Sequence, residues 1–184
     1  MPLLPTLIVI SGPAGAGKTT LAHKIAFAVG CPAICRDEIK EGMAHAAPGF
    51  VAGPGDELTK RTMPVFFGVL ELLLQAGVTT VAEAAFQDQV WRPRLEALSA
   101  LARIRVVHCT VGAGAAFDRI QRRRQGNPLR LAHADQGPRD AAEHRAGHDA
   151  FRRVSLDAPW LEVDTTDGYR PGFSEILSFV AVRD

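Results

Sequence analysis

The chain has 184 residues, 47% of them hydrophobic, and its 21 basic and 20 acidic side chains give a formal net charge of +1. This is the length of one domain with a substantial core, and the charge balance excludes the broad attraction to nucleic acid or membrane surfaces that strongly basic proteins have. No apolar run could cross a bilayer, and three cysteines without disulfide or metal-site spacing indicate reduced thiols, so we expect one cytoplasmic domain over residues 1–184, not associated with membranes.

The first predicted elements surround a phosphate-binding motif. Residues 12–19 read Gly-Pro-Ala-Gly-Ala-Gly-Lys-Thr, a complete Gly-x-x-x-x-Gly-Lys-[Ser/Thr] loop. The apolar run before it predicts a buried strand, Thr6 to Ser11, and the residues after it predict a helix, Lys18 to Val29. Glycines let the loop curl so that successive N–H groups point at a phosphate, and the helix N-terminus adds partial positive charge.

This loop is therefore the expected binding site of ATP. Lys18 can reach the β- and γ-phosphates, which also makes it a candidate catalytic residue, and the hydroxyl of Thr19 can ligate Mg²⁺. Pro13 is compatible with the loop because its second position need not donate an N–H. The nucleotide-binding residues predicted in this segment are Gly12, Pro13, Ala14, Gly15, Ala16, Gly17, Lys18, Thr19 and Thr20.

The second predicted strand, Pro32 to Cys35, leads into a helix predicted over Asp37 to Ala47. Ligands of parallel sheets bind beyond the carboxyl ends of the strands. Asp37 is therefore a candidate for the base that takes the proton of an acceptor hydroxyl, and it could also be the N-cap of the helix. Lys40 follows one turn later on the same face, where it could hold a phosphate or the acceptor, or could be a solvated helix residue.

A loop rich in proline and glycine, residues 48–55, separates this helix from the next. Apolar spacing predicts the next helix over Glu57 to Gln75, and Pro64 inside it could kink or divide it. We expect the acceptor to meet the segment from Lys40 to Arg61. The few charges of that segment favour a moderately apolar molecule that carries a hydroxyl group.

The third predicted strand, Val78 to Ala82, ends at Glu83. Phosphate-loop proteins commonly place an acidic residue here to hold Mg²⁺, and a charge that ends an apolar strand is costly unless it is used or paired. Glu83 is therefore a candidate ligand of Mg²⁺ or of the acceptor. Asp88 is a weaker second candidate that could instead be the N-cap of a helix, which is predicted over Trp91 to Leu101.

Arginines follow the fourth predicted strand, Ile104 to Val111. They occupy a helix predicted over Ala115 to Gln125 and the loop after it. The next helix is predicted over Arg139 to Val154. The arginines are Arg119, Arg122, Arg123, Arg124 and Arg130. An arginine on a mobile segment can neutralise charge that develops on a transferred phosphoryl group. We expect Arg119 and Arg123 to bind the nucleotide, Arg123 also to act in catalysis, and Arg130 to bind the substrate. A solvated basic face would account for some of these residues.

The last predicted strand, Trp160 to Val163, precedes a loop and a closing helix over Phe173 to Val182. Backbone of residues 164–168 could border the adenine, so Thr165 is a candidate cofactor-binding residue, although Asp, Thr and Gly are also typical of an ordinary turn. Strands and helices alternate throughout. The fold class predicted is α/β: a P-loop NTPase-type three-layer sandwich with a five-stranded parallel sheet and helices on both faces.

Three stretches of this sequence resemble the small P-loop kinases that include the 5′-hydroxyl polynucleotide kinase domain and chloramphenicol phosphotransferase, a group often described as AAA-type small ATP-binding proteins. They are residues 12–19, Ile34 to Lys40 and Ala116 to Arg124. The resemblance implies that Asp37 is the general base, that Lys40 stands where the family has an acceptor-side arginine, and that an arginine-rich lid spans roughly residues 119–150. Glu83 stands where an aspartate is common.

These observations predict an ATP-dependent kinase that transfers the γ-phosphoryl group to a hydroxyl of a small-molecule acceptor, with ATP and Mg²⁺ as cofactors. A 5′-hydroxyl nucleic-acid kinase is the less favoured alternative, because the near-neutral chain lacks a polynucleotide-binding charge pattern. A kinase acting on a nucleotide sugar and a non-catalytic ATP-binding sensor remain as further alternatives. Nothing in the sequence specifies the oligomeric state.

Two other classes of nucleotide-binding protein lack their motifs here. A GTP-driven switch needs an Asn/Thr-Lys-x-Asp motif, and residues 59–62 break that pattern at its last position. A motor or remodelling ATPase is disfavoured because the chain is short and has no paired Asp-Glu after the third predicted strand.

Overall fold

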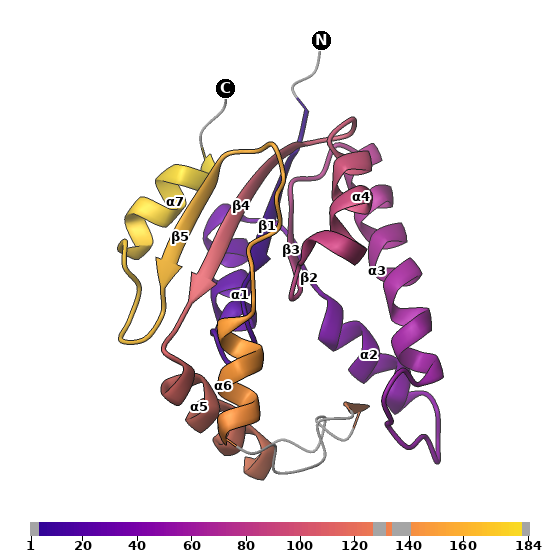
Figure 1. Cartoon of the computed structure of the whole chain (residues 1–184). Coiled ribbons are helices and arrows are strands. Elements are labelled where there is room, and N and C mark those ends of the chain that lie inside the picture. The colour runs from indigo at the N-terminus through magenta and orange to yellow at the C-terminus, as the bar shows by residue number, and fades with distance from the viewer. Residues whose placement is uncertain (1–3, 127–131, 134–140, 182–184) are drawn as a thin grey trace.

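The computed structural model describes residues 4–126, 132–133 and 141–181. It contains a five-stranded parallel sheet with helices on both faces (Figure 1). The strands are β1 (Thr6–Ser11), β2 (Ala33–Cys35), β3 (Thr80–Glu83), β4 (Arg103–Thr110) and β5 (Trp160–Asp164). The helices are α1 (Lys18–Val29), α2 (Arg36–His45), α3 (Glu57–Gln75), α4 (Asp88–Leu98), α5 (Ala113–Gly126), α6 (Ala141–Asp149) and α7 (Phe173–Ala181). The predicted fold class is confirmed.

The strand order places three carboxyl ends side by side. The order is β2-β3-β1-β4-β5, so β3 lies between the strand before the phosphate loop and the strand before α2. The register pairs Glu83 with Ile10 of β1 on one side and with Cys35 of β2 on the other. The phosphate loop, the start of α2 and the end of β3 therefore meet at one edge of the sheet, where parallel sheets bind ligands.

Alternate residues of the buried strands pack on opposite faces. Leu7 and Val9 of β1 face α3 and α4, where Phe66 and Leu95 are fully buried. Ile8 and Ile10 face the opposite side of the sheet. They belong to one buried cluster with Leu21 and Ile25 of α1 and Ile176 of α7. Figure 1 shows these two helix layers, with α5 and α6 beyond the carboxyl ends of β4 and β5. Because the central strands are buried on both faces, they read as continuous apolar runs.

Two predictions about the residues that cap helices are wrong. Asp37 is not an N-cap: α2 begins at Arg36, and the extended Cys35 precedes it. The strand enters the helix without a turn, which places the Asp37 carboxylate in the first turn, where the helix dipole favours it. Likewise, Asp88 is the first residue of α4, after Gln87.

Pro64 does not divide α3, although division was one of the two outcomes that the sequence allowed. That helix runs without a break over 19 residues. Its fully buried apolar side chains, among them Phe66 and Leu70, hold it against the sheet on the far side of the proline. Packing therefore outweighs the loss of one backbone donor. Within the described residues, none of the helices combines the length and apolar character that crossing a membrane requires.

Candidate active site

The phosphate loop packs tightly against the elements beneath it. Gly12, Gly15 and Gly17 all have positive φ angles, of 144°, 80° and 70°. A Cβ atom on Gly12 would collide with the carbonyl oxygen of Cys109 in β4, and one on Gly15 would lie 2.6 Å from the carbonyl oxygen of Ala116 in α5. Glycine is therefore required at both positions by conformation and by space.

Lys18 and Thr19 contact one buried carboxylate at the end of β3. The Thr19 hydroxyl donates a hydrogen bond of 3.0 Å to Oε2 of Glu83, and Lys18 Nζ lies 4.0 Å from Oε1. Lys18 also donates to the carbonyl oxygen of Pro13 at 3.0 Å. A threonine hydroxyl and a carboxylate are hard oxygen donors that suit Mg²⁺, so these two residues fit the metal that the sequence predicts.

Burial raises the pKa of the Glu83 carboxyl, and the nearby Asp37 adds to that effect. Lys18 and the hydrogen bond from Thr19 act in the opposite direction without cancelling the effect of burial. The site thus concentrates negative charge that a bound cation would balance.

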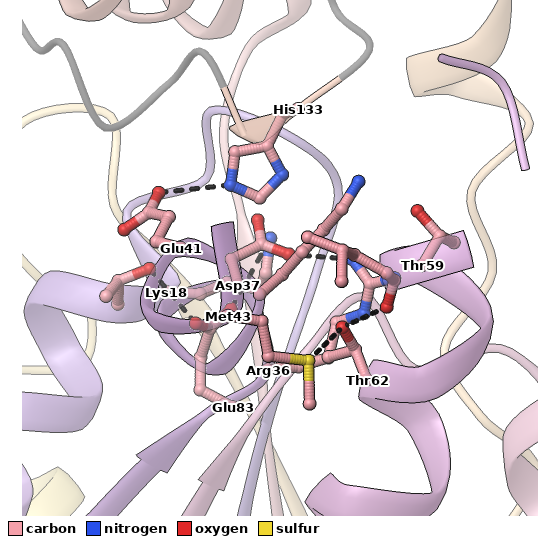
Figure 2. Close-up of polar contacts among 12 residues, drawn as sticks. Lys18, Arg36, Asp37, Glu41, Met43, Thr59, Thr62, Glu83 and His133 are labelled. Carbon is pink, nitrogen blue, oxygen red and sulfur yellow. Dashed lines mark hydrogen bonds and ion pairs between the residues drawn. The ribbon is translucent and has the colours of Figure 1, made fainter. Parts of the chain in front are cut away.

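Asp37 lies beside this group because α2 starts immediately after β2. Arg36 donates a hydrogen bond of 2.9 Å from a terminal nitrogen to Oδ1 of Asp37, and both side chains line the same cavity as Lys18 and Glu83 (Figure 2). The Nε atom of Arg36 is buried and has no hydrogen-bond partner among the described residues. A guanidinium donor and a carboxylate therefore stand together near the predicted γ-phosphate position.

Lys40 is buried, which excludes the solvated helix lysine considered from the sequence. Its Nζ donates to Oδ2 of Asp56 at 2.8 Å, and the two side chains are 3% and 8% exposed. Burial alone would raise the pKa of Asp56. The bonds from Lys40 and from the backbone N–H groups of Thr59 and Gly53 hold that pKa well below its usual range. Lys40 lines the cavity, but its charge is already matched by Asp56.

Arg119 connects the phosphate loop to the segment after β5. Its guanidinium donates to the carbonyl oxygens of Gly15, Thr165 and Thr166 at 3.3, 2.6 and 3.0 Å and to the Thr165 hydroxyl at 3.2 Å. That hydroxyl lies 3.0 Å from the carbonyl oxygen of Ala16. Arg119 and Thr165, both predicted to bind the nucleotide, thus brace the loop from outside.

The other predicted arginines differ in position. Arg123 is exposed and lines the cavity from α5, whereas Nε of Arg122 donates to the carbonyl oxygen of Asp118 in its own helix. Arg130 lies outside the described residues. His133 lines the same cavity as Arg123, and its Nε2 atom lies 3.0 Å from Oε1 of Glu41 in α2 (Figure 2).

One cavity of about 590 Å³ brings these groups together. The phosphate loop, the start of α2 and the end of β3 line it on one side, and α5 and His133 line it on another. Of the predicted site residues, the cavity wall includes Ala14, Gly15, Gly17, Lys18, Thr19, Thr20, Asp37, Lys40, Glu83 and Arg123. Its volume is typical of a small-molecule site.

Sequence reasoning did not assign several of the wall residues. They include Arg36, Trp91, Phe117 and Ile120, whereas Thr59 lies in the segment from Lys40 to Arg61 that we expected to meet the acceptor. Arg36 adjoins Asp37 and could have been included on that ground. Trp91 and Phe117 carried no signal, because an aromatic residue on a predicted helix is indistinguishable from a core residue before the helices are placed.

A family model described as "AAA domain" matches residues 7–154, which is most of the chain. The chain belongs to this AAA-domain family. The match includes the phosphate loop, Asp37, Glu83 and the arginines of α5. A comparison with curated proteins finds no match to the sequence.

Solved structures of similar fold include several kinases. A presumed kinase from Chloroflexus aurantiacus superposes with a TM-score of 0.84 at 22% identity, over 98% of this chain and 99% of that one. A gluconokinase from Sinorhizobium meliloti gives 0.58 at 17% identity, over 98% and 94%. Kti12 from Chaetomium thermophilum, in complex with ADP-AlF3, gives 0.64 at 16% identity, over 96% and 100%. At these identities the likenesses establish the P-loop kinase fold of this AAA-domain protein, a nucleotide-binding fold.

Proposed function

We propose that this protein is an ATP-dependent kinase that transfers the γ-phosphoryl group to a hydroxyl of a small-molecule acceptor. The observation that carries the proposal is that Asp37, Lys18 and Glu83 line one cavity next to the phosphate loop. A nucleotide-binding sensor needs the loop and the lysine but has no use for a second carboxylate beside the predicted γ-phosphate. Phosphoryl transfer needs it to orient the attacking hydroxyl.

In this proposal the residues around Lys18 hold the nucleotide. Backbone N–H groups of residues 12–19 bind the phosphates, and Lys18 turns from the carbonyl oxygen of Pro13 to the β- and γ-phosphates. Thr19 and Glu83 would hold Mg²⁺, which offsets the negative charge of the phosphates when bound. Arg119 and Thr165 keep the loop in shape through the contacts described above.

Asp37 accepts the proton of the acceptor hydroxyl and orients that hydroxyl toward the γ-phosphate. The bond from Arg36 fixes the carboxylate, and because Arg36 lines the cavity, a terminal nitrogen of its guanidinium can donate to an oxygen of the acceptor. Lys40 binds the acceptor less directly than the sequence predicts, since Asp56 holds its ammonium.

Arg123, with Arg130, would neutralise the charge that develops during transfer. We propose that residues 119–150 act as a lid on a single kinase domain spanning residues 1–184. The cavity has the volume of a small-molecule site, about 590 Å³, which favours a small acceptor over an extended nucleic acid.

The test is phosphoryl transfer by purified protein supplied with ATP and Mg²⁺. A screen of hydroxylated metabolites, nucleosides, antibiotics and 5′-hydroxyl oligonucleotides, read by ATP consumption, identifies the acceptor. Asp37→Asn should then lower kcat by about 10²–10⁴-fold while the affinity for ATP changes by less than about twofold, because the base acts after the nucleotide binds.

Asp157→Asn is the matched control, because Asp157 is exposed and does not line the cavity. The base assignment would be wrong if Asp37→Asn kept the turnover of the unaltered protein. Consumption of ATP only with oligonucleotides would replace the small-molecule acceptor by a nucleic acid. Tight binding of ATP without transfer to any compound of the screen would favour a sensor.

A further inference from the structure

Three side chains with metal-binding atoms meet where α1 packs against the junction of β2 and α2. The Nε2 atom of His23, Sγ of Cys35 and a carboxylate oxygen of Glu38 all lie within 4.8 Å of one another. Nε2 of His23 is 2.7 Å from Oε1 of Glu38 and 3.8 Å from Sγ of Cys35. The three residues come from separate elements, so the tertiary fold creates the cluster.

From this geometry we propose that His23, Cys35 and Glu38 form a binding site for a divalent transition metal ion, with Zn²⁺ the best match to the donor set. Imidazole nitrogen, thiolate sulfur and carboxylate oxygen are the three donor types that zinc takes in proteins, and three protein ligands leave a fourth position for water. Mixed nitrogen and sulfur donors make Mg²⁺ or Ca²⁺ a poor match.

The spacing of the donors needs only a small adjustment. Ligand atoms at about 2.0–2.3 Å from zinc lie roughly 3.3–3.7 Å apart in a tetrahedron. The distance from His23 to Cys35 is already near that value, and the contact from His23 to Glu38 must open by less than about 1 Å. On binding, a neutral His23 coordinates the ion through Nε2 with its ring proton on Nδ1, and the thiol proton of Cys35 leaves to solvent.

The surroundings favour a cation and leave it a way in. Cys35 is buried, whereas the side chains of His23 and Glu38 are 51% and 45% exposed, so the ion can enter from solvent. Burial first, and then the carboxylates of Glu83, Glu38 and Asp37, raise the pKa of the Cys35 thiol, so the ion must displace a proton that the thiol holds tightly. The same negative charges attract a divalent ion, and a coordinated thiol is deprotonated.

This site is separate from the predicted Mg²⁺ position in its ligands, although Cys35 pairs with Glu83 in the sheet. Its ligands flank Arg36 and Asp37, which lie between Cys35 and Glu38 in the chain. A bound ion would tie the first turn of α2 to α1 and hold that turn in place. The proposal does not depend on the activity of the protein.

Titration of the full-length protein with Co²⁺ in the absence of nucleotide tests the site. We expect one equivalent of Co²⁺ to bind and to give a near-ultraviolet band from sulfur-to-cobalt charge transfer. Added Zn²⁺ should displace the Co²⁺ and remove the band. His23→Ala and Glu38→Gln alter exposed side chains and should weaken the affinity by about 100-fold or more, because each removes a direct ligand and the loss of an outer-shell partner alone commonly costs about 10–100-fold. Cys35→Ser should abolish the band.

Two variants serve as controls. Cys31→Ser removes a thiol four residues away, and Glu83→Gln removes the predicted Mg²⁺ ligand; both should keep the band. Absence of the band in the unaltered protein, or its persistence in Cys35→Ser, would overturn the proposal. If Cys35→Ser does not fold by circular dichroism, the decision rests on His23→Ala, which overturns the proposal if its affinity for Co²⁺ is unchanged.

Discussion

Glu83 serves conflicting demands at the scale of one residue. Its carboxylate is buried, and burial raises its pKa against the opposing effects of Lys18 and Thr19. The folded protein therefore binds a proton at this carboxyl more tightly than the unfolded chain does. The stability that protonation of this group supplies is present below the unfolded pKa and is lost as the pH rises through the folded pKa. The ion that the site is proposed to bind would compensate for this cost.

Glu83→Gln should therefore stabilise the nucleotide-free protein at neutral pH, by about 0.5–2 kcal/mol, while turnover with the acceptor falls by about 10–100-fold. The reason is that glutamine keeps an oxygen for Thr19 but removes the buried charge. Thermal unfolding at several pH values checks the prediction, and the gain in stability should shrink toward acidic pH. Glu162→Gln, an exposed change on β5, is the control; equal effects from both would contradict the argument.

A buried ion pair links two elements, α2 and α3. Lys40 lies on α2, and Asp56 precedes α3, where its carboxylate also accepts from the backbone N–H of Thr59 at 2.7 Å. The side chain that caps α3 is thus the partner of the lysine that the sequence assigned to the acceptor. The pair positions the loop of Gly53 and Pro54, which forms part of the cavity wall.

Lys40→Met should lower the free energy of unfolding by about 3–5 kcal/mol, because it leaves the Asp56 charge buried without its partner. Urea unfolding measures the change, with Lys60→Met on the exposed face of α3 as the control. The pKa of Asp56 is lower in the folded protein than in the unfolded chain. The stability that its charged form supplies is therefore present above the unfolded pKa and is lost as the pH falls toward the folded pKa. If Lys40→Met lowered the free energy of unfolding by less than about 1 kcal/mol, the pair would contribute no more than a solvent-screened surface salt bridge does.

Arg119 joins elements that are distant in sequence, namely the phosphate loop, α5 and the segment after β5. Arg119→Lys should weaken ATP binding by about tenfold and lower the free energy of unfolding by about 1–3 kcal/mol. An ammonium group cannot reproduce the planar set of donors that contacts Gly15, Thr165 and Thr166. Nucleotide titration and urea unfolding measure both effects. Arg122→Lys is the control, because Arg122 contacts only its own helix, and an equally large loss there would show that the effect does not come from the contacts of Arg119.

At the scale of the whole molecule, His133 connects the two sides of the cavity. It follows α5 in the chain, contacts Glu41 of α2 and is 9% exposed at the side chain. The phosphate loop and the start of α2 form one wall, and α5 with His133 forms the other. The accessibility of the cavity should therefore depend on this contact.

His133→Ala should let α5 unfold locally more often, so that a protease can bind its backbone around Arg122 and Arg123. If the contact contributes about 1 kcal/mol, tryptic cleavage after Arg122 or Arg123 should be roughly fivefold faster. Glu41→Gln should have a similar but smaller effect, while His45→Ala, at an exposed position of α2, should have none. Unchanged cleavage in both His133→Ala and Glu41→Gln would show that the contact does not control access.

The sequence by itself determined the phosphate loop, the alternation of strands and helices, and the parallel sheet. These features are encoded locally: glycine spacing gives a loop conformation, and apolar runs give buried strands. Most predicted element ends lie within three residues of those observed, because caps and turn residues act over short distances. Pro64 is an instance where local rules did not hold, since burial of the surrounding helix face outweighs one lost hydrogen bond.

Only the tertiary structure decided how these pieces meet. The strand order places Glu83 between β1 and β2. The packing of α2 on α3 buries Lys40 in an ion pair with Asp56 instead of leaving it in solvent. The packing of α1 against β2 and α2 gathers His23, Cys35 and Glu38, whose spacing in the chain suggests no metal site. Spacing along the chain specifies which residues share one helix or strand, whereas contacts between elements depend on topology, which no local pattern encodes.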